Sequence, residues 1–111
     1  MNGDTIKTSS GAVFNVPICK VNHIKDAIFL IKQYKVKVYG ATEKAEKNIY
    51  QTKFNNSQAI IMGSEGKGLS KSVIDLCDEL IKIPLQGKIE SLNVSVACGT
   101  ILYEILRQKK Y

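Results

Sequence analysis

Short runs of apolar and β-branched residues alternate along this chain with stretches whose apolar positions recur every three or four residues. The runs are typical of buried strands, and the three-four spacing is typical of helices that bury one face. The polar stretch 42–47 predicts a loop or a short exposed helix, and residues 1–11 show no strand pattern. Four runs predict strands, at residues 16–21, 36–40, 59–62 and 80–83.

Three helices are predicted between and after these strands. Asn22 can cap the first helix through its side-chain oxygen, which makes the neighbouring His23 a surface residue. Ser70 can cap a second helix that continues through Cys77. In the third helix Gly99 costs about 1 kcal/mol relative to alanine, so we expect it to pack closely against another backbone. The apolar faces consist of Ile24, Ala27, Ile28, Ile31 and Tyr34 in the first helix and Val94, Cys98, Ile101, Leu102 and Ile105 in the third.

Strands that alternate with helices over short connections predict an α/β fold with a mostly parallel sheet and flanking helices. The length of 111 residues, with 44% hydrophobic residues, suits a folded domain rather than a disordered chain. No repeat, low-complexity segment or interdomain linker divides the sequence. Residues 1–111 are therefore predicted to form a single domain.

The charge balance of +6 favours a polyanionic partner such as RNA, although solubility alone also accounts for it. Fifteen of the sixteen basic residues are lysines, which attract phosphate diffusely, and only Arg107 offers bidentate recognition. No apolar run approaches the ~18 residues of a membrane span, and the N-terminus has no secretory pattern. A cytoplasmic location without membrane contact is expected.

The three cysteines, Cys19, Cys77 and Cys98, are widely spaced and include no C-x-x-C pair. Their odd number favours buried reduced thiols over a disulfide framework. A zinc site is also disfavoured, because only His23 could supplement the thiols as a ligand. No metal is therefore expected to take part in the function.

Two segments combine glycine or polar residues with the ends of predicted strands. Residues 62–69 read MGSEGKGL and match neither the Walker A pattern nor G-x-G-x-x-G. A turn at the carboxyl end of a parallel strand binds a ligand in many α/β proteins, yet it also serves as a plain turn. Residues 83–97 gather Ser91, Asn93 and Ser95 at the start of the last helix, where they can cap the helix or form a polar site.

Taken together, the two segments resemble the SpoU/TrmH-type ribose 2′-O-methyltransferases, which are S-adenosylmethionine-dependent RNA enzymes of the SPOUT superfamily. The resemblance rests on MGSEGKGL, on IPLQG beginning twenty residues after Gly63, and on SLNVSVACG. Residues 7–12 and the tail Leu102-Tyr103-Glu104 extend it over nearly the whole chain. It implies a C-terminal trefoil knot, a homodimer, and ribosomal or transfer RNA as the partner.

The resemblance also implies which residues form the site. The implied catalytic residues are Glu65, which matches a motif glutamate that shapes the site, and Ser91 and Asn93, which match polar residues near the transferred methyl group and the ribose. The chemistry suits these residue types, because a sulfonium methyl is already activated and the protein has to orient the 2′-hydroxyl and help remove its proton. The residues implied to bind S-adenosyl-L-methionine are Gly63, Ile83, Leu85, Leu92 and Ala97.

The chain departs from the family pattern in one respect. The family's first motif, an asparagine and an arginine that should precede Lys7, has no counterpart here, and Arg107 does not occupy its position. We therefore expect an N-terminally truncated domain that lacks its first strand or strands and part of its catalytic apparatus. A non-catalytic RNA-binding or dimerisation module is the alternative, whereas the absence of Walker and Rossmann patterns disfavours a generic nucleotide-binding domain.

Overall fold

The computed structural model describes residues 6–8, 17–19, 23–54, 57–63, 68–85 and 93–110, the first two ranges by their backbone alone. Strands and helices largely alternate, as the sequence predicts. In chain order the elements are β1 (Ile6–Thr8), β2 (Pro17–Cys19), α2 (Ile24–Lys32), β3 (Lys37–Ala41), β4 (Gln58–Ile61), α3 (Lys71–Leu76), β5 (Glu79–Ile81) and α4 (Val94–Lys110).

Three parallel strands form the central sheet, in the order β4–β3–β5. The middle strand is β3, in which Tyr39 lies opposite Ile60 of β4 and Glu79 of β5. β1 and β2 form a separate antiparallel pair, in which Lys7 lies opposite Ile18. The predicted α/β class with a mostly parallel sheet is confirmed.

The strand β1 contradicts the expectation that residues 1–11 contain no strand. Its three residues carry one apolar side chain, that of Ile6, and so short a stretch holds no readable period. The strand forms because its backbone pairs with that of β2, and such a contact between separate segments leaves no signal in the local sequence.

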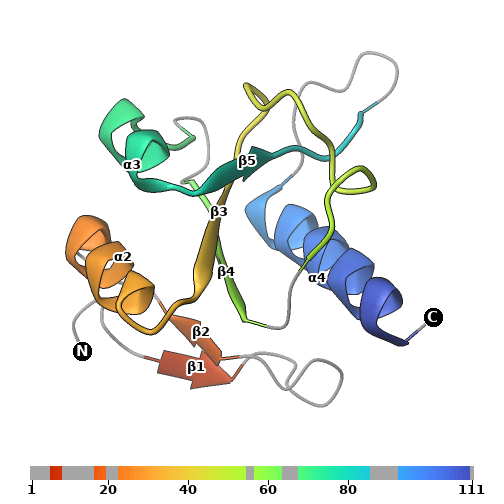
Figure 1. The fold of residues 1–111 in the computed structure, drawn as a ribbon. Helices are drawn as coiled ribbons and strands as arrows, with labels where there is room; N and C mark the ends of the chain where they lie inside the picture. Colours follow the sequence, from red (N-terminus) through yellow and green to blue (C-terminus); the bar gives the residue numbers. More distant parts are fainter. Residues whose placement is uncertain are drawn as a thin grey trace.

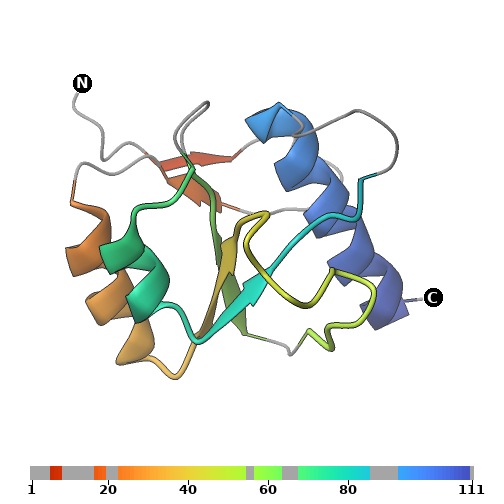
Figure 2. The same cartoon turned by 90° about the horizontal axis from the view of Figure 1, so that it is seen from above.

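Helices cover both faces of the central sheet. Figures 1 and 2 show α2 and α3 on one side of it and α4 on the other. Successive residues of β3 point to opposite faces, so Val38 packs with Ile28 of α2 while Tyr39 packs with Ile101 of α4. Each of these four residues is at most 1% exposed. The sheet therefore separates two hydrophobic cores, and β3 contributes to both.

The four predicted strands are present, with their ends shifted by one or two residues. The burial of β4 is lower than expected. The continuous apolar run 59–62 predicts a strand covered on both faces. Only Ile61 of β4 is buried, and the other three residues are half-buried. β4 lies at an edge of the described sheet, whereas β3 takes the fully covered central place.

The ends of α2 differ from the prediction. His23, rather than Asn22, occupies the N-cap position, and its exposed side chain makes no capping hydrogen bond. Asn22 lies outside the described residues. Tyr34 is 73% exposed, so its assignment to the apolar face is wrong. The helix ends at Lys32 and Lys35 adopts a left-handed φ of 60°, which leaves Tyr34 in the turn that leads to β3.

Local capping and the following connections agree with the sequence. The Ser70 hydroxyl oxygen caps α3 by accepting a hydrogen bond from the Val73 N–H at 3.3 Å, and Cys77 takes the C-cap position. The stretch 42–47 is a loop, one of the two predicted outcomes, and it is anchored by Ala45 at 5% exposure.

α4 buries Ile101 and Ile105 on the predicted face. Gly99 corrects the expectation of a close backbone contact, because a Cβ placed there would meet no atom of the described residues within 4 Å. Gly99 lies about 200° around the helix from Ile101 by the helical repeat, so it points away from the sheet. Its place in the helix is not explained by packing within the described part of the chain.

A buried carboxylate on α4 goes beyond the sequence-based expectations. Glu104 is 5% exposed and accepts hydrogen bonds from Arg107 Nε at 2.8 Å and Nη2 at 2.9 Å, and from Gln108 Nε2 at 2.8 Å. Gln108 also donates to the Thr52 carbonyl oxygen at 2.7 Å and accepts from the Phe54 N–H at 3.0 Å. This network fastens the end of α4 to the segment that precedes β4.

Replacing Glu104 with glutamine is expected to lower the free energy of unfolding by about 2 kcal/mol at neutral pH, because the amide offers Arg107 one acceptor oxygen instead of two and no negative charge. The hydrogen bonds from Arg107 hold the pKa of Glu104 below its ordinary value. The stabilisation is therefore present above about pH 4.3, the pKa of an unfolded glutamate, and is lost as the pH falls through the lower folded pKa.

Urea unfolding of both proteins as a function of pH measures this effect, with Glu46→Gln, an exposed neutralisation in the loop after β3, as the matched control. The gap between wild type and Glu104→Gln is expected to narrow in acid. A gap of constant size across this range would show that the carboxylate charge contributes nothing.

Candidate functional site

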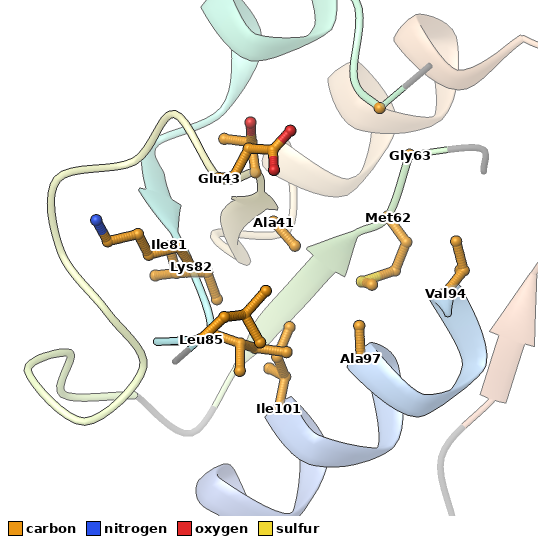
Figure 3. Close-up of a pocket in the computed structure, with 13 residues that line it drawn as sticks. Ala41, Glu43, Met62, Gly63, Ile81, Lys82, Leu85, Val94, Ala97 and Ile101 are labelled. Carbon is orange, nitrogen blue, oxygen red and sulfur yellow. The ribbon is translucent and has the colours of Figure 1, made fainter. Parts of the chain in front are cut away.

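A pocket opens at the carboxyl ends of the three parallel strands. The described residues enclose about 160 Å³ there (Figure 3). Ala41 ends β3, Gly63 follows β4, and Ile83 follows β5, so the same edge of the sheet supplies three sides of the pocket. The fourth side is α4, through Ala97 and Ile101. Ligands of parallel α/β proteins bind at this edge, so the pocket is the candidate site.

The pocket is smaller than the ~300–1,000 Å³ typical of small-molecule sites. Two segments that border it along the chain, 64–67 and 86–92, lie outside the described residues. Apolar side chains dominate its described walls, including Met62, Leu85 and Ile101. Such walls suit the flat apolar faces of a heteroaromatic ring better than a chain of phosphates.

The glycine turn after β4 brings two stretches of backbone together. A Cβ at Gly63 would lie 2.3 Å from the carbonyl carbon of Gly68 and 2.6 Å from its Cα, distances that real side chains do not reach. Gly68 itself has a φ of 67°, a left-handed conformation that favours glycine. The two glycines thus serve different needs of the turn, close approach of backbone at Gly63 and positive φ at Gly68.

Four of the five residues expected to bind the cofactor line this one pocket, although they come from three different elements. Gly63 follows β4, Ile83 and Leu85 follow β5, and Ala97 lies in the first turn of α4. The fifth, Leu92, lies outside the described residues. The pocket thus brings together positions as far apart in the sequence as Gly63 and Ala97, which are separated by 34 residues.

Of the three expected catalytic residues, the structure describes Asn93, whereas Glu65 and Ser91 lie outside the described residues. The Asn93 side-chain oxygen accepts a hydrogen bond from the Ser95 N–H at 2.8 Å, and its backbone oxygen accepts one from the Ala97 N–H at 2.8 Å. Asn93 therefore caps α4, which is one of the two roles the sequence leaves open for it. Its neighbour Val94 lines the pocket.

Three polar residues of the pocket, Thr42, Glu43 and Lys82, are absent from the sequence-based prediction. Each lies one or two residues beyond the end of β3 or β5, so the rule that ligands bind at strand carboxyl ends could have singled them out. The Thr42 hydroxyl oxygen accepts a hydrogen bond from the Lys44 N–H at 3.2 Å. Figure 3 shows the Lys82 side chain extending away from Met62 and Ala97.

The two cysteines whose side chains are described, Cys77 and Cys98, are free thiols, as the sequence predicts, but they are half-buried rather than buried. Burial raises the pKa of both thiols, which keeps them protonated. The Cys77 thiol donates to the Val73 carbonyl oxygen at 3.4 Å. Neither residue lines the pocket, so nothing points to a chemical role for them.

Part of the lysine charge is neutralised at the amino ends of the strands, opposite the pocket. Lys37 begins β3 and lies 2.7 Å from a Glu79 carboxylate oxygen, and Lys47 lies 3.7 Å from the other oxygen. The contact raises the pKa of Lys37 and lowers that of Glu79. Lys32 similarly lies 3.5 Å from Asp78. Positive charge available to a polyanion must therefore come from the other lysines.

The described residues form a small α/β fold, in which three strand ends, a glycine turn and a final helix surround a candidate ligand site. Among the described residues no helix is long and apolar enough to cross a membrane. The chain belongs to the SpoU rRNA Methylase family, whose model matches residues 1–103. This finding confirms the resemblance based on the glycine and serine segments.

Curated relatives from several bacteria share one name. The chain is 38% identical to the 23S rRNA (guanosine-2'-O-)-methyltransferase RlmB of Yersinia pestis over 109 aligned residues. This alignment covers 98% of the chain and 44% of RlmB. The chain is 41% identical to RlmB of Vibrio cholerae serotype O1 over 103 aligned residues, which are 93% of the chain and 42% of that RlmB. The chain thus spans less than half the length of these relatives.

Solved structures share the fold. The SpoU methyltransferase AviRb from Streptomyces viridochromogenes, in complex with the cofactor AdoMet, matches 92% of this chain and 42% of its own with a TM-score of 0.76 and 27% identity. The A. aeolicus TrmH/SpoU tRNA modifying enzyme matches 92% of this chain and 52% of its own with a TM-score of 0.75 and 29% identity. The small parallel sheet and its helices are therefore those of SpoU structures.

Proposed function

We propose that this chain is the donor-binding part of an S-adenosylmethionine-dependent RNA ribose 2′-O-methyltransferase domain, acting on ribosomal or transfer RNA in the cytoplasm. The observation that carries the proposal is the pocket that unites Gly63, Ile83, Leu85 and Ala97, the described residues implied to bind the donor. The names of the relatives, which are 23S rRNA and tRNA enzymes, support the reaction and the class of substrate. Residues 1–111 are proposed to belong to one domain of this kind.

The residues of the pocket fit the donor. An adenine ring matches the apolar walls formed by Met62, Leu85 and Ile101, and Leu92 is proposed to complete them. The missing side chain of Gly63 lets the Gly68 backbone approach, and both glycines line the edge of the pocket. The donor, when bound, supplies a methyl group already activated by its sulfonium. The binding residues of this chain then have to hold the donor and exclude water from the site.

The chain's polar residues are proposed to act on the RNA. Ser91 and Asn93 orient the ribose so that its 2′-hydroxyl oxygen points toward the donor, and Glu65 shapes the pocket for the nucleotide. The proton of the 2′-hydroxyl has to leave during the transfer, and groups that accept it contribute about 10²–10⁴ in rate. None of these tasks requires a metal ion. Lysines that lack a carboxylate partner attract the phosphate backbone.

A trefoil knot is proposed for the C-terminal part of the fold. In this arrangement the segment that ends in α4 passes through a loop formed by the preceding strands and turns. The support is the family membership together with the position of α4 beside three separate strand ends. A knot would explain how short loops hold a donor without a large domain around it.

We also propose that the chain forms a homodimer through α4. Val96 and Tyr103 lie seven residues apart on one face of the helix and are 55% and 57% exposed. Exposed apolar surface of this kind often marks an interface. The Val96→Glu and Tyr103→Glu double variant is therefore expected to be monomeric where the wild type is a dimer, as measured by light scattering at tens of micromolar.

Phe29→Glu serves as the matched control for the dimer, because Phe29 is 55% exposed on α2, on the opposite side of the sheet. This variant is expected to remain dimeric. A wild-type protein that is strictly monomeric at these concentrations would contradict the proposal, as would a double variant that still dimerises.

Calorimetric titration of S-adenosylmethionine, or of its demethylated product S-adenosylhomocysteine, into the folded protein tests the proposed function. We expect saturable heat with one site per chain, together with a rise in the melting temperature. Absence of both heat and thermal shift at millimolar ligand would overturn the assignment of the pocket to this donor.

A further inference from the structure

Among the described residues that line the pocket, two carry charged side chains, the exposed Glu43 and the half-buried Lys82. Figure 3 shows the Glu43 carboxyl group at the same end of the pocket as Gly63, away from Leu85 and Ile101. Lys82 extends outward. The site therefore has an apolar end and an acidic end.

The backbone around Glu43 is held in place from both sides. The Thr42 N–H donates to the Ile81 carbonyl oxygen at 2.9 Å, which ties the loop to β5. The Thr42 carbonyl oxygen accepts from the Ala45 N–H at 3.1 Å, and Ala45 is buried at 5% exposure. Glu43 lies between these anchors, so its side chain is carried at a fixed point of the pocket rim rather than on a free loop.

The Glu43 carboxylate has no hydrogen bond or ion pair within the described residues, in contrast to two other glutamates of the chain. Glu79 is paired with Lys37, and Glu104 with Arg107. A carboxylate that a ligand covers loses contact with water, and this loss is costly unless the ligand supplies hydrogen-bond donors. Glu43 is exposed at the rim of the pocket, so a ligand that extends over it is expected to carry hydrogen-bond donors at that end.

We propose that the Glu43 carboxylate binds the two vicinal hydroxyl groups of the adenosyl ribose, an inference that rests on the proposed function. With the adenine ring against the apolar walls, the ribose attached to it reaches the end of the pocket where Glu43 and Gly63 lie. A carboxylate has two oxygens that can each accept a hydrogen bond from one of two adjacent hydroxyls, as acidic residues do for the ribose in dinucleotide sites.

The test is a calorimetric comparison of wild type, Glu43→Ala and the matched control Glu46→Ala, with three ligands. Glu46 is an exposed glutamate of the same loop that does not line the pocket. The ligands are S-adenosylhomocysteine, its 2′-deoxy analogue, and 5′-methylthioadenosine, which keeps the adenine and the ribose hydroxyls but lacks the amino-acid end. Melting curves establish that each variant is folded.

Glu43→Ala is expected to weaken binding of S-adenosylhomocysteine and of 5′-methylthioadenosine by roughly tenfold each, the effect of losing a charge-assisted hydrogen bond. Glu46→Ala is expected to match the wild type. Removing the 2′-hydroxyl from the ligand should weaken binding to the wild type and have little further effect on Glu43→Ala, because the two changes remove the same interaction.

Two results would overturn the inference while leaving the proposed function intact. Unchanged affinity of Glu43→Ala for all ligands would show that the carboxylate does not contact them. A loss for S-adenosylhomocysteine but none for 5′-methylthioadenosine would show that Glu43 binds the ammonium of the amino-acid end instead. If the folded wild type binds none of the three, the proposed function fails and the role of Glu43 falls with it.

Discussion

Gly63→Val is expected to abolish binding of S-adenosylhomocysteine. A Cβ at this position would lie 2.3 Å from the carbonyl carbon of Gly68, so the turn after β4 has to open before any side chain fits. Opening moves backbone at Gly63 and Gly68, which both line the pocket. The two methyl groups of valine then occupy further space at the edge of the site. Calorimetric titration of the folded variant measures the loss.

The matched control is Ser57→Val, which introduces the same side chain at an exposed position just before β4, at the other end of the strand. This variant is expected to bind as the wild type does, and melting curves of both variants separate a local effect from unfolding. Normal binding by a folded Gly63→Val would show that the donor does not use the turn, and the site would have to be sought elsewhere.

The second large effect concerns catalysis. The 111-residue chain is expected to bind the donor yet to transfer its methyl group to RNA at least about 10²–10⁴ times more slowly than RlmB of Yersinia pestis, because the usual cost of lacking one proton-transfer group is of this size. Arg107 is the only arginine of the sequence, and both described contacts of its guanidinium go to Glu104. These contacts hold Arg107 at the end of α4, and it does not line the pocket.

Incubation with ribosomal or transfer RNA and a labelled donor measures the transfer, with the RlmB protein of Yersinia pestis as the active comparison. Donor binding with negligible transfer would also agree with a non-catalytic RNA-binding module. A separate polypeptide segment that supplies an arginine can be mixed with the chain to distinguish the two. Methyl transfer restored by this segment would favour an enzyme over a non-catalytic module. Rapid transfer to a ribose 2′-oxygen by this chain alone would contradict the prediction and point to another group, such as Glu65 or a lysine from the second copy in the proposed dimer.

The sequence predicts those elements whose formation depends on a local pattern. The three-four spacing locates the buried face of α4, and Ser70 marks the start of α3 through a hydrogen bond within four residues. β1 escapes prediction because its pairing with β2 is not local. The burial of Glu104 escapes for a similar reason, since Gln108 links it to backbone that lies more than fifty residues earlier.

The residues of the candidate site also divide into some that a local sequence pattern predicts and others that it does not. Gly63 and Ile83 belong to segments that match family motifs, and the structure brings them to one pocket. Glu43 lies outside both motif segments, and it reaches the pocket because β3 occupies the middle of the sheet with its end beside those of β4 and β5. The order of strands is a tertiary property, so residues that share a site only through that order cannot be predicted from spacing.

The division of Val38 and Tyr39 between two cores also fixes the register of the central strand. Sliding β3 by one residue would exchange the two side chains between the faces of the sheet. The Tyr39 ring, which now meets Phe54 edge-on with 5.0 Å between ring centroids, would then have to fit beside Ile28 in the space of a valine. Because β3 pairs with both of its neighbours, such a slip would misalign all three strand ends at once. The alternation of a small and a large side chain in β3 therefore keeps the strand ends that line the pocket in register.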